Sequence, residues 1–320
     1  MVPTYGNIGF IGLGMMGVPM VENLIKKTDG TTSIYVFDVV EDPAKQLCSK
    51  HPERVRKGEN PRHVAEKSNV IISMVPEGEH VRSVYLTPGT GVLAADVNGK
   101  TLIDCSTIDT ATSLAVREEA LGRYPSTYFV DAPVSGGVLG AQKATLTFMI
   151  GASDDDPRLP MLKDVMGKMG RNLVACGGPS LGLTAKLCNN YCSGLIAIAV
   201  SEAMNIGMKS GMDPRVLASV FHSSTAQSSI CDDWCPVPGL CPEAPASNGY
   251  RGGFKVQLMR KDFGLAVDTA KRVGARLALG DKGLEVYTET MNDPRCKDLD
   301  SRVVYRYLGG DEEWEQKLRR

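Results

Sequence analysis

The sequence has almost no net charge, because 36 Lys and Arg residues are balanced by 37 Asp and Glu residues, leaving −1 at pH 7. Proteins that bind nucleic acid or an anionic membrane surface usually present a basic patch to it. We therefore expect neither nucleic acid nor a membrane as a partner.

Long hydrophobic runs are also missing. The longest apolar run, Gly194 to Val200, is closed by Ser201 and Glu202, far short of the ~20 residues that a membrane span needs. It predicts a buried helix. The chain reaches an apolar strand by Ile8, which leaves no room for a signal peptide or an Arg-rich presequence. We expect that the protein stays where it is made, unless a targeting segment is missing.

The nine cysteines include no C-x-x-C pair, and scattered thiols are typical of a reducing compartment. One cluster contains residue types that could bind a metal: His222, Cys231, Asp232, Asp233, Cys235 and Cys241. Because its C-x3-C-x5-C spacing fits no usual structural zinc pattern, we predict loop or core thiols and no metal, with zinc as the alternative.

A chain of 320 residues is long enough for two domains. Short β-branched runs alternate with helical segments in the first half, which predicts a mainly parallel sheet. The predicted strands are 8–11, 33–37, 70–75, 102–105 and 128–131, with helices at 15–27 and 110–121. Two further runs, 146–150 and 172–175, flank a helical stretch at 157–169 and could extend that sheet.

The pattern changes near Gly177-Gly178-Pro179-Ser180. Afterwards only helical segments follow, and the stretch 235–253 is a Pro- and Gly-rich loop. The predicted helices are 183–208, one starting at Asp213-Pro214, 258–273 and 282–291. We predict a boundary that separates domain 1–180 from domain 181–320.

The first predicted strand runs into the sequence GFIGLGMMG, in which Gly12, Gly14 and Gly17 form G-x-G-x-x-G. Such glycines permit a tight turn, a close approach of a pyrophosphate, and packing of the following helix. The loop also contains Leu13, Met15 and Met16. With a strand before it and a helix after it, the motif predicts a Rossmann-type dinucleotide-binding domain. A glycine turn in another α/β protein is the alternative.

Asp38 ends the second predicted strand, at about the spacing that a ribose-binding carboxylate has in this motif. Its carboxylate can accept hydrogen bonds from both ribose hydroxyls and would repel a 2′-phosphate. Val39 and Val40 follow in place of an arginine. The pattern therefore favours NAD over NADP.

Three segments near predicted strand ends carry further candidate residues. Val75-Pro76 ends one strand and Thr107 follows another. Ligands bind outside the carboxyl ends of such strands, although an ordinary loop explains each as well. Ser135, Gly136 and Gly137 form a loop after the 128–131 strand whose amides and hydroxyl could hold a carboxylate or phosphate; a tight turn is the alternative.

Lys186, Asn189 and Asn190 are spaced i, i+3 and i+4, so they share one helical face. Their neighbours are mostly apolar, which makes a solvated stripe the weaker alternative. Burial would lower the pKa of the lysine and let it exchange protons near neutral pH.

Five motifs, in chain order, resemble the β-hydroxyacid dehydrogenase family: GFIGLGMMGVPM, DCSTID, DAPVSGG, GLTAKLCNN and FKVQLMRKDFGLA. The resemblance covers essentially the whole chain. It implies a 6-phosphogluconate dehydrogenase-like fold, an α/β Rossmann N-terminal domain followed by an all-α C-terminal domain. The loop CPVPGLCPEAPASNGYRGGF resembles that of members that oxidise 3-hydroxyisobutyrate in the breakdown of valine.

The resemblance also assigns roles to residues. Lys186 matches the catalytic lysine, and Asn190 matches the asparagine that helps to hold substrate. The loop Ser135 to Gly137 matches the site for the substrate carboxylate. Lys261 matches a lysine that reaches the cofactor, and Asp262 either orients it or forms a surface pair. Thr107, Val75 and Pro76 match further cofactor contacts.

The implied activity is NAD-dependent oxidation of a small 3-hydroxy acid by a homodimer or homotetramer. The resemblance implies a mitochondrial enzyme, although no presequence is visible; otherwise we expect a cytoplasmic one. Two alternatives stay open: a related semialdehyde reductase of the tartronate, succinic or glyoxylate type, and a non-catalytic NAD-binding scaffold. Activity on a panel of short hydroxy acids separates them.

Overall fold

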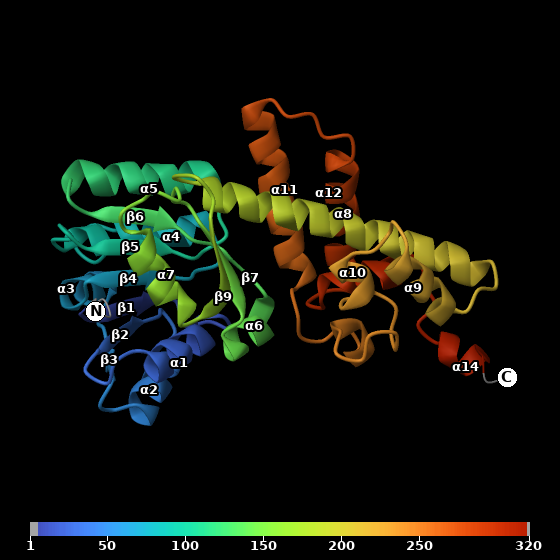
Figure 1. Ribbon diagram of the computed structural model, residues 1–320, viewed down its shortest axis with the longest axis horizontal. Helices are drawn as coiled ribbons and strands as arrows, with labels where there is room; N and C mark the ends of the chain where they lie inside the picture. The colour runs from blue at the N-terminus through green and yellow to red at the C-terminus, as the bar shows by residue number, and fades with distance from the viewer. Residues whose placement is uncertain (1–5, 319–320) are drawn as a thin grey trace. The chain divides into compact units, whose positions relative to one another are not determined.

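The computed structural model describes residues 6–318, so residues 1–5, on which the expected absence of a presequence partly rests, lie outside the described part. The chain divides into two compact units, Met1–Lys186 and Leu187–Arg320. Helix α8 (Leu181–Lys209) begins in the first unit and continues into the second (Figure 1). The division into a cofactor-binding domain 1–180 and a helical domain 181–320 stays a prediction.

The first unit contains a six-stranded sheet in which every pairing is parallel. Its strand order is β3-β2-β1-β4-β5-β6, the order of a dinucleotide-binding fold. The strands are β1 (Ile8–Ile11), β2 (Ile34–Phe37), β3 (Val55–Lys57), β4 (Val70–Ser73), β5 (Thr101–Asp104) and β6 (Tyr128–Asp131). The predicted Rossmann fold class is thus confirmed.

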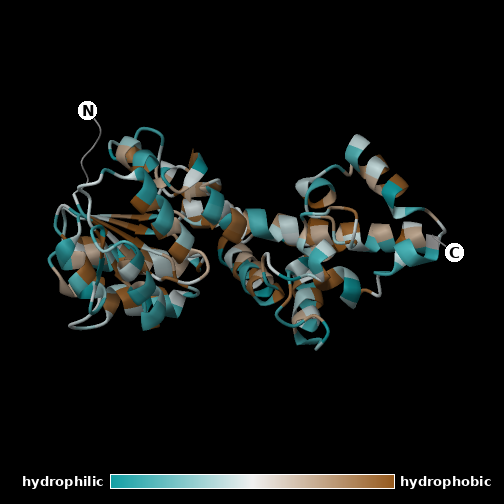
Figure 2. Ribbon diagram, turned by 90° about the horizontal axis from the view of Figure 1, so that it is seen from below, coloured by the Kyte–Doolittle hydropathy of each residue, from teal (hydrophilic) through white to brown (hydrophobic). Residues whose placement is uncertain are grey.

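Both faces of this sheet are buried, because alternate side chains point to opposite sides of a strand. Phe10 and Ile103 belong to one core cluster, whereas Ile11 and Leu102 belong to the other. This explains why the strands read as continuous apolar runs, and they stand out as hydrophobic ribbons in Figure 2.

Helices cover both faces of the sheet. Those of the first unit are α1 (Gly17–Lys27), α2 (Glu41–Lys50), α3 (Pro61–Lys67), α4 (Gly78–Leu86), α5 (Thr110–Arg123), α6 (Gly137–Lys143) and α7 (Leu159–Gly167), with the 3-10 turn η1 (Val92–Ala94). Residues of α1, α2 and α7 pack in one cluster and residues of α3, α4 and α5 in the other.

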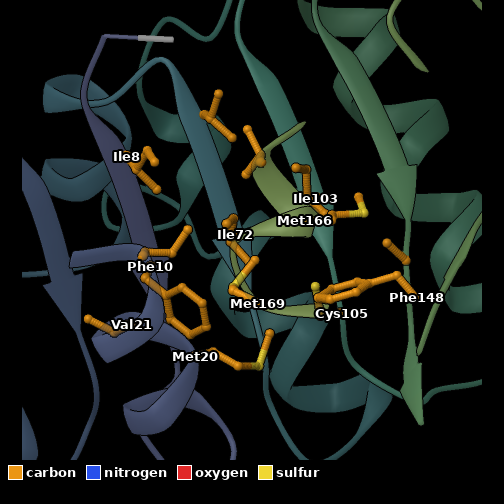
Figure 3. Packing of buried hydrophobic residues seen from close by; sticks show 14 of the residues in the cluster. Ile8, Phe10, Met20, Val21, Ile72, Ile103, Cys105, Phe148, Met166 and Met169 are labelled. Carbon is orange, nitrogen blue, oxygen red and sulfur yellow. The ribbon is translucent and has the colours of Figure 1, made fainter. Parts of the chain in front are cut away.

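A second, three-stranded sheet corrects one prediction. Segments 146–150 and 172–175 do form strands, but they belong to a separate sheet of order β7-β8-β9, in which the first pairs with β7 and the two pair with each other, and they do not extend the main sheet. The strands are β7 (Val134–Ser135), β8 (Leu146–Ile150) and β9 (Gly170–Ala175). Phe148 of β8 packs in the same cluster as Cys105, Met166 and Met169 (Figure 3), so side chains of this sheet pack against the main sheet. A backbone hydrogen bond of 2.8 Å from the Gly151 amide, just after β8, to the Asp131 carbonyl of β6 also joins the two.

The second unit is helical over its described residues, as predicted. Besides most of α8 it contains α9 (Pro214–Ser223), α10 (Ser229–Asp232), α11 (Val256–Val273), α12 (Gly280–Asn292), α13 (Val304–Tyr307) and α14 (Trp314–Leu318), with the 3-10 turns η2 (Pro245–Asn248) and η3 (Ser301–Val303). Asp213 caps α9 by accepting a hydrogen bond from the Arg215 amide, as the Asp-Pro pair predicts.

Helix α8 is less buried than expected. Its length and composition would suffice for a membrane span, a test that core helices also pass, but only 33% of its most apolar window is buried. Residues on one side, such as Ala197 and Met204, pack in the core of the second unit, whereas Ile206 is 68% exposed. A helix of this length has more apolar surface than the contacts within this unit cover.

Candidate active site

Two glycines of the loop after β1 are required by the fold itself. Gly12 has φ +99°, and a Cβ there would lie 2.2 Å from the Met74 carbonyl oxygen. A Cβ on Gly17 would lie 1.9 Å from the Gly12 carbonyl oxygen. The turn and the close packing of α1 on β1 therefore exclude any side chain at these positions, as the motif predicts.

Gly14 differs, because nothing in the protein requires a glycine there. It is exposed, its φ is not in the left-handed region, and a Cβ would meet no atom within 4 Å. The open space lies just before α1, which has no acidic residue in its first turn. A pyrophosphate fits such a place. Leu13 beside it is buried, whereas Met15 is 69% exposed.

Asp38 follows β2 and lies against the same loop. Its carboxylate accepts hydrogen bonds from the Leu13 amide at 2.6 Å and the Val40 amide at 2.8 Å. These bonds fix a negative charge beside the glycine turn. Val39, which is 89% exposed, and Val40 follow Asp38, so no cationic side chain stands next to this carboxylate in sequence.

A buried polar network supports the loops after β4 and β5. Asp104 Oδ1 accepts hydrogen bonds from the hydroxyls of Ser73, at 2.8 Å, and Ser106, at 2.6 Å. The Ser106 hydroxyl in turn accepts from the Val75 amide at 3.0 Å. The network thereby joins the segment that contains Val75 and Pro76 to the one that contains Thr107. The only sequence signal was the polar residue that ends an otherwise apolar strand.

Burial raises the pKa of Asp104 from 3.8 to about 6. Its second oxygen, Oδ2, has no hydrogen-bond partner within the described residues. The folded protein therefore holds this proton to a higher pH than the unfolded chain does, so the free energy of unfolding falls as the pH rises through this window.

Asp104→Asn should remove this pH dependence, which amounts to on the order of 3 kcal/mol for a shift of about two pKa units. We expect the variant to gain stability relative to the native chain between pH 4 and pH 7. Urea unfolding should be followed by circular dichroism, because both tryptophans, Trp234 and Trp314, lie in the second unit. A stability difference that is independent of pH would contradict the prediction.

The Ser135–Gly137 segment runs from the last residue of β7 to the first residue of α6. Gly136 and Gly137 are exposed and have φ +129° and +62°, values that favour glycine. Helix α6 is tied to α1 by the buried Asn23, whose side-chain amide donates to the Ala141 carbonyl at 2.7 Å. Nothing in the sequence indicates this link between α1, which follows the glycine loop, and the Ser135–Gly137 segment.

Lys186 lies in the first two turns of α8 and is only 7% exposed. The solvated stripe that sequence analysis left open is therefore excluded for this residue. Asn190, one turn further along the same helix, is 6% exposed. Buried polar side chains of this kind are usually held by partners.

In the second unit, the Asn190 side-chain amide donates a hydrogen bond of 2.6 Å to Asp262 Oδ2. Lys261 Nζ lies 3.2 Å from Asp262 Oδ1. Asp262 is 1% exposed, which excludes the surface pair, and its carboxylate contacts the asparagine as well as the lysine. The asparagine side chain is thus held in one orientation.

In the cysteine-rich segment, as elsewhere among residues 6–318, no three His, Cys, Asp or Glu side chains lie close enough together to hold a metal ion. Cys231 and Cys235 are buried among apolar residues. Burial raises the pKa of Cys235 to about 12, so its thiol stays protonated. His222 instead pairs with Asp232 at 2.9 Å.

The predicted site residues fall into two groups. The cofactor loop, Asp38, the loops with Val75 and Thr107, and the Ser135–Gly137 segment follow the carboxyl ends of strands in the first unit, where ligands of such sheets bind. Lys186 belongs to the same unit, whereas Asn190 and Lys261 belong to the second. Their roles stay predictions.

Two family models together match nearly the whole chain. Residues 7–178 match the NAD-binding domain of 6-phosphogluconate dehydrogenase. Residues 181–308 match a domain described as NAD-binding of NADP-dependent 3-hydroxyisobutyrate dehydrogenase. Binding of a nicotinamide dinucleotide is thus confirmed, without a decision between NAD and NADP.

Several relatives are similar over both units. A probable mitochondrial 3-hydroxyisobutyrate dehydrogenase of Dictyostelium discoideum is 43% identical, over 94% of this chain and 90% of its own. The 3-hydroxyisobutyrate dehydrogenase of Pseudomonas aeruginosa is 40% identical, over 95% and 99%. The human mitochondrial enzyme is 38% identical, over 88% and 80%.

Among solved structures, Mycobacterium tuberculosis 3-hydroxyisobutyrate dehydrogenase with L-serine has a TM-score of 0.85 and 33% identity, covering 95% of this chain and 99% of that one. Psf3 in complex with NADP+ and 2-OPP, 20% identical with a TM-score of 0.75 over 94% and 99%, shares the fold.

Proposed function

Because this chain belongs to the 3-hydroxyisobutyrate dehydrogenase family, it is an NAD(P)-linked oxidoreductase, and we propose that it oxidises 3-hydroxyisobutyrate to methylmalonate semialdehyde with NAD. Beyond membership of the family, the observation that carries this proposal is the burial of Lys186. The helical spacing and the family motif both point to this lysine as the group that exchanges a proton with the substrate.

Lys186 acts as general base in the proposed mechanism. The uncharged amine of a lysine can accept the proton of the substrate hydroxyl. When bound, the nicotinamide cofactor supplies the hydride acceptor. The alcohol of the substrate becomes an aldehyde because its carbon loses a hydride and its oxygen loses a proton. In the reverse direction the protonated lysine donates the proton to the carbonyl oxygen.

Two other groups hold the substrate. The hydroxyl of Ser135 and the amides of Gly136 and Gly137 bind its carboxylate. These two glycines are exposed and have positive φ angles, so their backbone is accessible to a ligand. Asn190 holds the hydroxyl end. Its amide has two N–H donors, and the bond to Asp262 uses one of them, which orients the other.

The preference for NAD rests on Asp38. Its carboxylate lies against the Leu13 amide, so a ribose bound there meets an acceptor for its hydroxyls, and a 2′-phosphate meets a like charge. We assign the remaining cofactor contacts to Gly12–Gly17, Val75, Pro76, Thr107 and Lys261.

A substrate panel tests the proposed function. The purified chain should be assayed with NAD and with NADP by the absorbance of the reduced cofactor, on 3-hydroxyisobutyrate, L-serine and other short hydroxy acids. We expect the highest kcat/KM for 3-hydroxyisobutyrate with NAD. Faster reduction of tartronate, succinic or glyoxylate-type semialdehydes would indicate the related reductases, and no turnover at all would indicate the non-catalytic scaffold.

We also propose that the chain forms a homodimer or homotetramer through its helical unit. Large apolar side chains there are exposed, including Ile206 at 68%, Val216 at 53% and Val220 at 46%. Sedimentation equilibrium tests this, and a monomer would contradict it.

Eukaryotic relatives are named as mitochondrial and the Pseudomonas relative is not, so cell fractionation decides between mitochondrial and cytoplasmic localisation.

A further inference from the structure

Asp131, the last residue of β6, is a buried carboxylate for which the proposed mechanism has no use. It is 2% exposed. Both of its oxygens accept backbone hydrogen bonds of 2.8 Å, Oδ1 from the Ser180 amide and Oδ2 from the Leu183 amide. Both donors lie at the start of α8, which begins at Leu181. The carboxylate thus bonds the end of β6, an edge strand of the main sheet, to the start of the helix that carries Lys186.

The packing around this carboxylate allows very little movement. A Cβ on Gly182 would lie 2.2 Å from the Met149 carbonyl oxygen and 2.8 Å from Asp131 Oδ2. A Cβ on Gly151 would lie 2.0 Å from Asp131 Oδ1. Two glycines thus bring the backbones of α8 and of the loop after β8 into direct contact with the Asp131 side chain.

Electrostatics favour the same arrangement. The first amides of a helix lack partners within the helix and carry a partial positive charge, which a carboxylate stabilises. Burial raises the pKa of Asp131 overall, and the hydrogen bonds from the Leu183 and Ser180 amides offset part of that rise. Hydrogen bonds of this charge-assisted kind are stronger and shorter than neutral ones.

We propose that Asp131 is a positioning residue that sets the place of the Lys186 amine by holding the start of α8 on β6. Lys186 is three residues after Leu183, less than one helical turn, so any displacement of the Leu183 amide is passed on to the lysine. Asp131 touches neither the reacting atoms nor the cofactor in this role. The inference rests on the proposed role of Lys186.

Asp131→Asn and Asp131→Glu test the proposal. The asparagine places an N–H₂ group against one of the two amides, and the glutamate keeps both acceptors but moves them by one methylene group. We expect kcat on 3-hydroxyisobutyrate to fall by about 10- to 100-fold in both, because an error on the order of 1 Å in a reacting group can cost ~10²-fold. The dissociation constant for NAD should change by less than about twofold, because the substitutions displace the lysine and leave the glycine loop after β1 unchanged.

Two readouts separate positioning from loss of structure. Turnover is expressed per NAD-binding molecule, so that unfolded protein does not contribute. The deuterium isotope effect on kcat, with substrate deuterated at the hydroxyl-bearing carbon, should rise because a misplaced base slows the chemical step and not the release of product. Asp213→Ala, which removes the side-chain cap at the start of α9, should leave both readouts unchanged.

The outcomes also distinguish failure of this inference from failure of the proposed function. If Lys186→Ala abolishes turnover but both Asp131 variants keep kcat within twofold per NAD-binding molecule, the positioning role is wrong. An unchanged isotope effect alongside a lower kcat would also overturn it. If Lys186→Ala itself keeps turnover, the proposed role of Lys186, on which this inference rests, is wrong. If the native chain does not oxidise 3-hydroxyisobutyrate, the proposed function is wrong.

Discussion

Replacing Lys186 with alanine should reduce kcat by at least ~10²-fold, the usual contribution of a positioned acid or base, while NAD still binds with nearly native affinity. The residue is buried on α8, and the substitution removes the only group to which we assign the hydroxyl proton. The cofactor loop, which lies after β1, is not altered. Stopped-flow measurement of NADH formation and a fluorescence titration with NADH would give the two quantities.

Lys186→Arg separates proton transfer from charge. Arginine keeps a cation but is not deprotonated in proteins, so it should be as inactive as alanine if the lysine acts as base. Small primary amines added to Lys186→Ala should restore part of the rate. Lys209→Ala, at the exposed end of the same helix, provides the matched control. Turnover within about tenfold of native for Lys186→Ala would remove the residue from the mechanism.

Replacing Asp38 with alanine should raise KM for NAD by about 10- to 100-fold. This is the effect of losing hydrogen bonds to a charged group, which contribute ~1.5–3 kcal/mol to binding. KM for NADP should fall or stay the same, because the repulsion of the 2′-phosphate disappears. The ratio of kcat/KM for the two cofactors, measured with the same substrate, reports this change.

The native contacts of Asp38 require a second variant. Since its carboxylate also holds the Leu13 and Val40 amides, alanine loosens the glycine loop as well. Asp38→Asn keeps an acceptor oxygen and removes only the charge, so it isolates the electrostatic part. Asp42→Ala, an exposed acid on α2, should leave the cofactor ratio as it is. An unchanged ratio in both Asp38 variants would exclude this residue from cofactor selection.

The sheet shows what periodicity can and cannot predict. Five of the six main strands were predicted because each buries both faces and so forms an unbroken apolar run. Strand β3 escaped prediction because only Val55 in it is buried, as suits an edge strand. Segments 146–150 and 172–175 resemble the main strands in apolar character, so the sequence could not say that they form a separate sheet with β7.

The candidate site divides in the same way. Gly12, Gly14, Gly17 and Asp38 are close in sequence and obey a local rule, which is why the motif predicts them. Asp104 and Asp131 could not be identified, because their partners come from other strands or from the start of α8, up to 52 residues away. Nothing local distinguishes them from any carboxylate at the end of a strand.

The sequence by itself determined the family, the α/β and all-helical halves, the binding of a nicotinamide cofactor, and the choice of Lys186 as the candidate base, because each depends on neighbours in the chain or on motifs in order. Only the tertiary structure decided which polar groups are buried and what holds them. Burial and hydrogen bonding depend on contacts between distant segments, and here those contacts connect Asp131 to the helix of Lys186 and Asp262 to Asn190.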